Sequence, residues 1–155
     1  MFGWFKSVDR LVYIRFRKEK VYLSHYPEGE TFEELPIIAV IRKGDRFRVE
    51  GVGKAVLDLP QENRSIVYTP FEPFVLEPEN FELAELTLRH LLQQDKRYKN
   101  SWIKARFVIH PDKSYISEQE EDAYRELGLS VGAREVAVYV GNSLDASALK
   151  ALFER

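Results

Sequence analysis

Hydrophobic and polar positions alternate along the first part of the chain in a way that predicts β-strands. Residues 11–17 alternate in part, and residues 20–24 are rich in β-branched and aromatic side chains. Because only Lys18 and Glu19 separate these two segments, we expect them to form a hairpin. The polar stretch from Tyr26 to Glu34 contains glycine and proline and is predicted to be a loop.

The segments that follow favour two more strands. The run from Pro36 to Ile41 is apolar enough for a strand that is buried on both faces, and such a strand would be central in the sheet. Residues 43–45 have turn chemistry, and residues 46–50 alternate strictly. A proline-rich stretch then separates a β half from an α/β half, and it contains Pro70, Pro73 and Pro78.

In the second half the hydrophobic spacing changes to three and four residues, which is typical of a helix with one buried face. This spacing runs from Asn80 to Gln94, and Asn80 is predicted to be the N-cap. Residues 103–109 and 135–140 predict two strands, and Pro111 would end the first of them.

Two further helices are predicted from their ends. Ser117 and Glu120 have the spacing of a capping box, which predicts a helix that begins there and is ended by Gly128. The last helix would be capped by Asn142 or Ser143.

This order of elements predicts an α/β fold. Three strands in antiparallel succession, followed by strands that alternate with helices and return to the same sheet, give a mixed sheet with helices packed on its faces. It is the order of an actin-like, or ribonuclease-H-like, half-domain.

Composition narrows the class of protein. The chain has 155 residues, of which 45% are hydrophobic and 31% are charged, so we expect one folded domain rather than a disordered chain. It has no cysteine, which excludes disulfides and zinc–thiolate sites. The net charge of −2 does not favour nucleic acid or an acidic membrane. No segment has the pattern of a membrane span or a signal peptide, so we expect a cytoplasmic protein.

Several motifs add a resemblance to a known family. The segments 105–111 and 117–126, followed by Gly132-Ala-Arg-Glu-Val136, resemble the first domain of the bacterial actin MreB, of the rod shape-determining family. The strand 36–41 is similar to the family's Pro-Ser-Val-Val-Ala-Ile strand, and residues 50–55 are similar to its Ala-Val-Gly-x-x-Ala segment. The resemblance implies a single actin-like domain over 1–155 that lacks the family's second domain, with a small-lobe region at about 42–70.

The departures from the family concern its ATPase site. The family holds phosphate with an Asp-x-Gly-Thr turn between its first two strands, whereas residues 14–19 contain no aspartate, glycine or threonine. The family's Glu-Glu-Pro segment, in which a glutamate positions the attacking water, is replaced by Val140-Gly141-Asn142. We therefore expect a pseudo-ATPase without catalytic, cofactor-binding or metal-binding residues.

What the resemblance implies about function is contact with other proteins. We expect a non-catalytic protein of bacterial cell shape or cell-envelope organisation, with MreB or another cell-shape protein as its partner, or a second copy of itself. An alternative is half of a nucleotide site that a partner chain completes.

The amino terminus is a candidate contact segment. Some MreB proteins bind membrane through a short amphipathic amino terminus, and residues 1–10 are similar to it. Phe2, Trp4 and Phe5 could enter the headgroup boundary while Lys6 stays at the surface, at the inner face of the membrane. The other interpretation is that these aromatic side chains pack on their own domain.

Basic residues of the first hairpin are a second candidate surface. In segment 13–22 the cations are interleaved with aromatic residues that could stack on bases, and they are Arg15, Arg17, Lys18 and Lys20. A nucleic-acid-binding module is therefore an alternative function, although the acidic net charge and a solvated strand face argue against it. His25, His90 and His110 have no metal-ligand spacing, and we expect them to lie at the surface or to bond locally.

Overall fold

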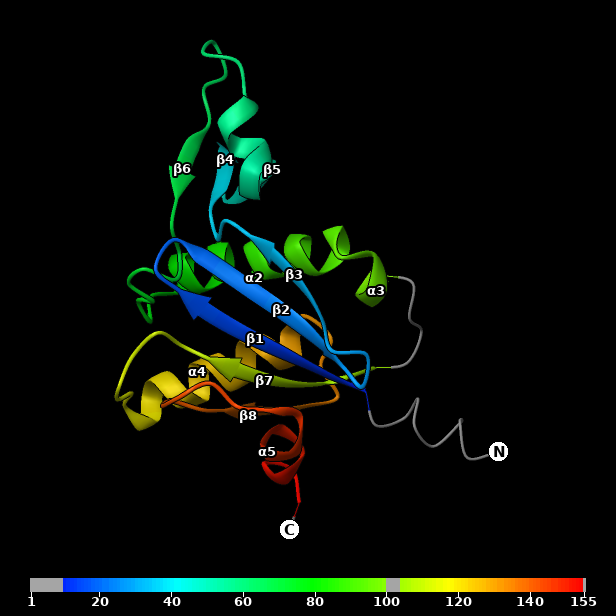
Figure 1. Cartoon of the computed structure of the whole chain (residues 1–155). Coiled ribbons are helices and arrows are strands. Elements are labelled where there is room, and N and C mark those ends of the chain that lie inside the picture. Colours follow the sequence, from blue (N-terminus) through cyan, green and yellow to red (C-terminus); the bar gives the residue numbers. More distant parts are fainter. Residues whose placement is uncertain (1–9, 100–103, 155) are drawn as a thin grey trace.

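The computed structural model describes residues 10–99 and 104–154, and they form two sheets with helices (Figure 1). The main sheet has five strands in the order β3-β2-β1-β7-β8. Its strands are β1 (Leu11–Arg17), β2 (Lys20–Tyr26), β3 (Glu30–Glu34), β7 (Arg106–His110) and β8 (Glu135–Val138). Strand β2 is antiparallel to both β1 and β3, and β7 and β8 run parallel to β1, so the predicted mixed sheet is confirmed.

The third strand of this sheet is not the predicted one. Strand β3 lies inside the stretch 26–34 that the sequence predicts to be a loop. It forms the edge of the sheet beside β2, and only Phe32 in it is apolar. An edge strand with polar residues does not have the pattern of a buried strand, which explains why the prediction failed.

The apolar run at 36–41 belongs instead to a second, three-stranded sheet. Strand β4 (Ile38–Lys43) is central there, between β5 (Arg46–Val52) and β6 (Ile66–Tyr68), and the short helix η1 (Gly53–Asp58) follows β5. Only its first residues Ile38, Ala39 and Val40 are buried, so β4 is not the two-face-buried core strand that we expected.

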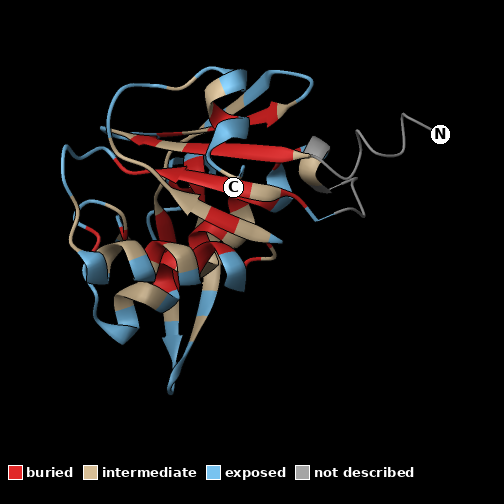
Figure 2. Cartoon of the chain, turned by 90° about the horizontal axis from the view of Figure 1, so that it is seen from below, coloured by how far each residue is buried: buried red, intermediate tan, exposed pale blue. Residues whose placement is uncertain are grey.

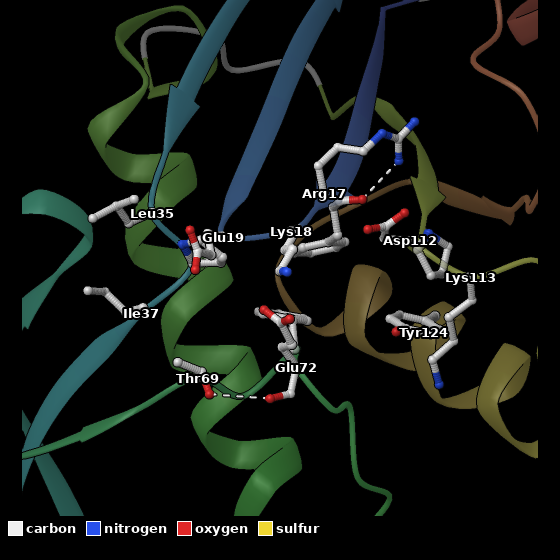
Figure 3. A pocket seen from close by; sticks show the side chains of 14 residues that line it. Arg17, Lys18, Glu19, Leu35, Ile37, Thr69, Glu72, Asp112, Lys113 and Tyr124 are labelled. Atoms are coloured by element: carbon white, nitrogen blue, oxygen red, sulfur yellow. Dashed lines mark hydrogen bonds between the residues drawn. The ribbon is translucent and has the colours of Figure 1, made fainter.

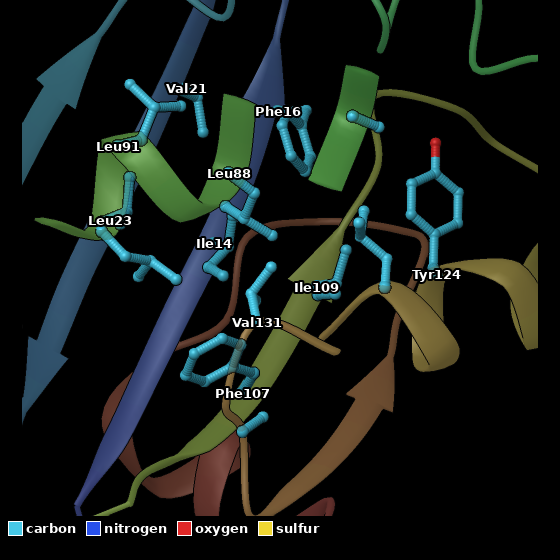
Figure 4. Packing of buried hydrophobic residues seen from close by; sticks show 14 of the residues in the cluster. Ile14, Phe16, Val21, Leu23, Leu88, Leu91, Phe107, Ile109, Tyr124 and Val131 are labelled. Carbon is cyan, nitrogen blue, oxygen red and sulfur yellow. The ribbon is translucent and has the colours of Figure 1, made fainter. Parts of the chain in front are cut away.

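The helices cover both faces of the main sheet. Helices α2 (Pro78–Gln94) and α4 (Glu118–Ser130) pack on one face, and α5 (Ala146–Ala151) packs on the other, while α3 (Lys96–Lys99) follows α2. In Figure 4 side chains of β1, β2 and β7 meet those of α2 and α4 in the larger core. Buried positions accordingly concentrate along the strands of the main sheet (Figure 2).

Some helix ends differ from the sequence prediction. Helix α2 begins at Pro78 with Glu77 as its N-cap, while the Asn80 amide donates to two loop carbonyls, those of Pro70 and Val75. The capping box of Ser117 and Glu120 is confirmed.

The other two differences lie in the last part of the chain. Gly128 does not end α4, because it lies inside the helix and lets it approach Val136 of β8. Helix α5 is capped by Asp145, not by Asn142 or Ser143. No helix within the described residues is both long and apolar enough to cross a membrane.

Candidate functional site

The hairpin between β1 and β2 ends in a tight two-residue turn. Arg17 pairs with Lys20, and Lys18 and Glu19 form the turn between them. Glu19 has a φ of 65°, a conformation that usually favours glycine. The Arg17 guanidinium donates to the Phe16 carbonyl at 2.8 Å and to the Ser143 hydroxyl at 3.1 Å. The hairpin is thus tied to the loop that follows β8.

Buried hydrogen bonds from β1 and β7 also hold the loop that follows β8. His110 is 1% exposed at the end of β7; its Nε2–H donates to the Gly141 carbonyl at 2.9 Å, and its Nδ1 accepts from the Tyr13 hydroxyl at 2.6 Å. The Tyr13 oxygen also accepts the Leu144 N–H at 3.2 Å. Burial lowers the pKa of His110, so the imidazole is neutral at physiological pH.

The expectation for the histidines is therefore corrected for two of them. His110 is buried and bonds to a residue 97 positions away. His25 is also buried and pairs with Asp95 at the other end of the main sheet. His90 bonds locally, to the Leu86 carbonyl at 2.8 Å, as expected. Neither long-range pair leaves a signal in sequence spacing.

A cavity of about 450 Å³ opens beside the hairpin (Figure 3). The segments around it are the hairpin, the connection between β3 and β4, the loop before α2 and the loop after β7. Its lining is largely apolar, and its charged residues are Arg17, Lys18, Glu19, Glu72, Asp112 and Lys113.

Three aromatic residues, Phe16, Phe71 and Tyr124, line this cavity, and Phe74 stacks on the last two without lining it. Phe16 stacks on Phe71, Phe71 on Phe74, and Phe74 on Tyr124, with ring centroids 4.3, 5.9 and 4.3 Å apart. Tyr124 is 2% exposed, and burial raises the pKa of its hydroxyl. Within the part of the chain that the structure describes, that hydroxyl makes no hydrogen bond. These rings make this side of the cavity apolar, which suits an apolar group better than a phosphate.

A shallower hollow continues from the cavity to the carboxyl ends of β7 and β8. It includes His110 and Asn142, and it shares four residues with the cavity: Arg17, Pro111, Asp112 and Lys113. The Lys113 amine donates to Glu120 at 2.7 Å, and this bond lowers the pKa of that carboxyl. Among the described residues no group of three or more metal-ligating side chains is found.

Three of the four basic residues of the hairpin, Arg15, Arg17 and Lys20, contact neighbouring side chains. The guanidinium of Arg15 lies over the rings of Tyr13 and Tyr22, at 5.5 and 5.0 Å from their centroids. Arg17 bonds to Ser143, and the Lys20 amine lies 3.8 Å from a Glu33 carboxylate oxygen. This arrangement gives little support to a nucleic-acid surface, which stays a prediction.

The other candidate residues, Phe2, Trp4, Phe5 and Lys6, lie outside the described residues. Their contact with a membrane or a partner therefore stays a prediction as well.

Comparison with known proteins places the fold. No family model and no curated protein matches the chain. Among solved structures, MreB5 of Spiroplasma citri bound to ADP is similar with a TM-score of 0.64 and 20% sequence identity, over 86% of this chain and 39% of that chain. A non-polymerising MamK mutant bound to AMPPNP matches with a TM-score of 0.61 and 11% identity, over 85% and 41%.

The double helical filament of MamK is similar too, with a TM-score of 0.59 and 12% identity over 86% of this chain and 41% of that chain. The chain thus spans about 40% of the length of these structures. The fold that the MreB resemblance implies is confirmed: the chain has the mixed sheet and helices of a partial actin-like domain.

Proposed function

We propose that this chain is a non-catalytic actin-like protein that acts through protein–protein contacts in bacterial cell shape or cell-envelope organisation. The observation that carries the proposal is the β1–β2 turn. A turn that binds phosphate needs backbone N–H groups that the ligand can approach, which glycine allows, and an acid that helps to organise the metal. Here the turn is closed by Arg17 and Lys20 and contains Lys18 and Glu19.

The second support is the chemistry around the neighbouring loop. The family's water-positioning glutamate corresponds to the segment Val140-Gly141-Asn142, and a valine side chain cannot polarise water. The Gly141 carbonyl is engaged by His110, and Ser143 by Arg17. These hydrogen bonds hold the loop in place. At the end of the sheet where the family hydrolyses nucleotide, this chain therefore has residues with a structural role.

The partner is proposed from the fold. The similar structures include a filament of MamK, and a surface of this chain would bind an actin-like filament subunit of the MreB type or a second copy of the chain. A cavity with an apolar wall and a mixed-charge rim fits a protein contact better than a phosphate group. A nucleotide half-site completed by a partner chain is the alternative.

Co-sedimentation tests the proposal. The purified full chain is mixed with filaments of the MreB-type protein from the same organism and centrifuged, beside the chain alone and beside the filaments' soluble monomers. We expect the chain to pellet with filaments and to stay in the supernatant without them. Pelleting of the chain alone would assign the contact to a second copy. If the chain pellets neither alone nor with filaments, the proposal is contradicted.

A further inference from the structure

The Tyr124 hydroxyl is a polar group at the cavity beside the hairpin, and it has no partner within the described protein. Tyr124 is 2% exposed and lines the cavity, and in Figure 3 its hydroxyl oxygen is directed into it. No hydrogen bond joins that oxygen to any residue in 10–99 or 104–154. Buried polar groups are nearly always hydrogen-bonded, because an unpaired one costs free energy. A molecule with a polar atom at its buried end would complete this bond.

The rest of the cavity suits an aromatic ring. Each of the four segments around it contributes apolar side chains, which are Phe16, Leu35, Pro36, Ile37, Phe71 and Pro111. The rings of Phe16 and Phe71 stack at 4.3 Å between centroids, and aromatic rings pack favourably against a further ring, stacked or edge to face. The volume of about 450 Å³ falls within the range of about 300–1,000 Å³ that is typical of small-molecule sites. A small molecule built on one aromatic ring would therefore be held by its apolar part.

The rim of the cavity carries unpaired charges of both signs. Its exposed charged side chains that form no ion pair with another described residue are Lys18, Glu19, Glu72 and Asp112. Arg17 adds a second cation beside Lys18. A ligand with a charge of one sign would face like charges on part of this rim, and like charges that face each other are unfavourable. The rim therefore matches a zwitterion, which presents an ammonium and a carboxylate together.

A free aromatic amino acid with a polar group on its ring combines these three properties. Its ring would fill the apolar cavity, its ammonium and carboxylate would face the rim, and a phenol oxygen would reach the Tyr124 hydroxyl. We propose that the cavity binds a free amino acid with a hydroxylated aromatic ring, such as L-tyrosine. This ligand site goes beyond the protein contact proposed above. Ligand binding is measured without filaments, so either proposal can fail alone.

Ligand-observed saturation-transfer NMR tests the buried end of the site. The dissociation constants of L-tyrosine and L-phenylalanine are measured for the purified full chain and for Tyr124→Phe. The natural chain should bind L-tyrosine about fivefold more tightly than L-phenylalanine, because only L-tyrosine completes the hydrogen bond. In Tyr124→Phe this preference should disappear, while L-phenylalanine binds within about twofold of its original affinity. The variant should unfold in urea as the natural chain does, because the hydroxyl that it loses has no partner within the described protein.

The rim is tested with analogues of L-tyrosine and with a matched pair of variants. Tyramine lacks the carboxylate, 3-(4-hydroxyphenyl)propanoate lacks the ammonium, and each should bind about threefold more weakly than L-tyrosine. Lys18→Gln should weaken L-tyrosine by about threefold. Lys20→Gln, on the same hairpin but outside the cavity, should leave its affinity unchanged.

Three results would overturn the proposal. The first is no saturation transfer to L-tyrosine. The second is a preference for L-tyrosine that persists in Tyr124→Phe, because the hydroxyl would then have no part in recognition. The third is equal binding of L-tyrosine and the uncharged N-acetyl-L-tyrosine amide, which would assign the cavity to a tyrosine side chain of a protein partner.

Discussion

The Tyr13–His110 hydrogen bond provides the sharpest stability prediction. Tyr13→Phe removes the hydroxyl that donates to the buried Nδ1 of His110 and accepts the Leu144 N–H. A buried acceptor left without its partner costs about 1–3 kcal/mol, and a lost half-buried hydrogen bond costs about 0.5–1.5 kcal/mol. The ring stays, so almost no packing is lost, and we expect a loss of about 2–3 kcal/mol in the free energy of unfolding at pH 7.5.

The assay is urea unfolding followed by circular dichroism, with an unchanged m value as the check that unfolding stays two-state. The matched control is Tyr22→Phe on the neighbouring strand. The Tyr22 ring lies against Arg15 and no hydrogen bond of its hydroxyl is recorded in the described structure, so this change should stay within about 0.5 kcal/mol. Equal effects of the two substitutions would refute the role of the buried chain.

The same network predicts a dependence on pH. Burial lowers the pKa of His110 in the folded state, whereas in the unfolded chain it is about 6.5. Below about pH 6.5 the unfolded state therefore binds more protons than the folded state, and the stability that the neutral imidazole contributes falls as the pH falls. His110→Gln should have a shallower loss of stability between pH 7 and pH 5 than the natural chain. An identical slope would contradict the lowered pKa.

Three further substitutions test the local geometry, each by urea unfolding. Glu19→Gly should stabilise the chain by up to about 1 kcal/mol, because Glu19 has a φ of 65°; a loss would show that its side chain matters more than its backbone. Gly128→Ala should destabilise by about 1–2 kcal/mol, although alanine favours helices, because its Cβ would lie 2.6 Å from Val136 Cγ2; the loss should vanish in a Val136→Ala background, and a gain would contradict the close packing. Ser117→Ala should cost about 1 kcal/mol through the lost bond to the Glu120 N–H, and no change would contradict the capping box.

Local patterns predict much of the fold because the elements concerned are amphipathic. The hairpin 11–24, the helix 80–94 and the capping box at Ser117 each have a clear period or end signal, and each forms. Strand β3 has no such signal, because it is an edge strand with polar side chains on both faces. The run at 36–41 predicts a strand, but its period does not say which sheet the strand joins.

For the candidate site, the sequence predicts only the absence of a phosphate-binding turn. The altered phosphate turn can be seen in the residues 14–19 themselves. The link from Tyr13 to His110 and the cavity beside the hairpin depend on segments that are distant in sequence and meet only in the fold. Burial, not spacing, decides that His110 is a structural residue.

The measurement that tests the central proposal most directly is titration calorimetry of the purified full chain with Mg-ATP, together with a phosphate-release assay. A chain whose β1–β2 turn holds Arg17, Lys18 and Glu19 in place of a phosphate loop should give no binding heat at micromolar nucleotide and no phosphate release above the buffer rate. Micromolar binding of ATP, or measurable hydrolysis, would contradict a non-catalytic actin-like protein.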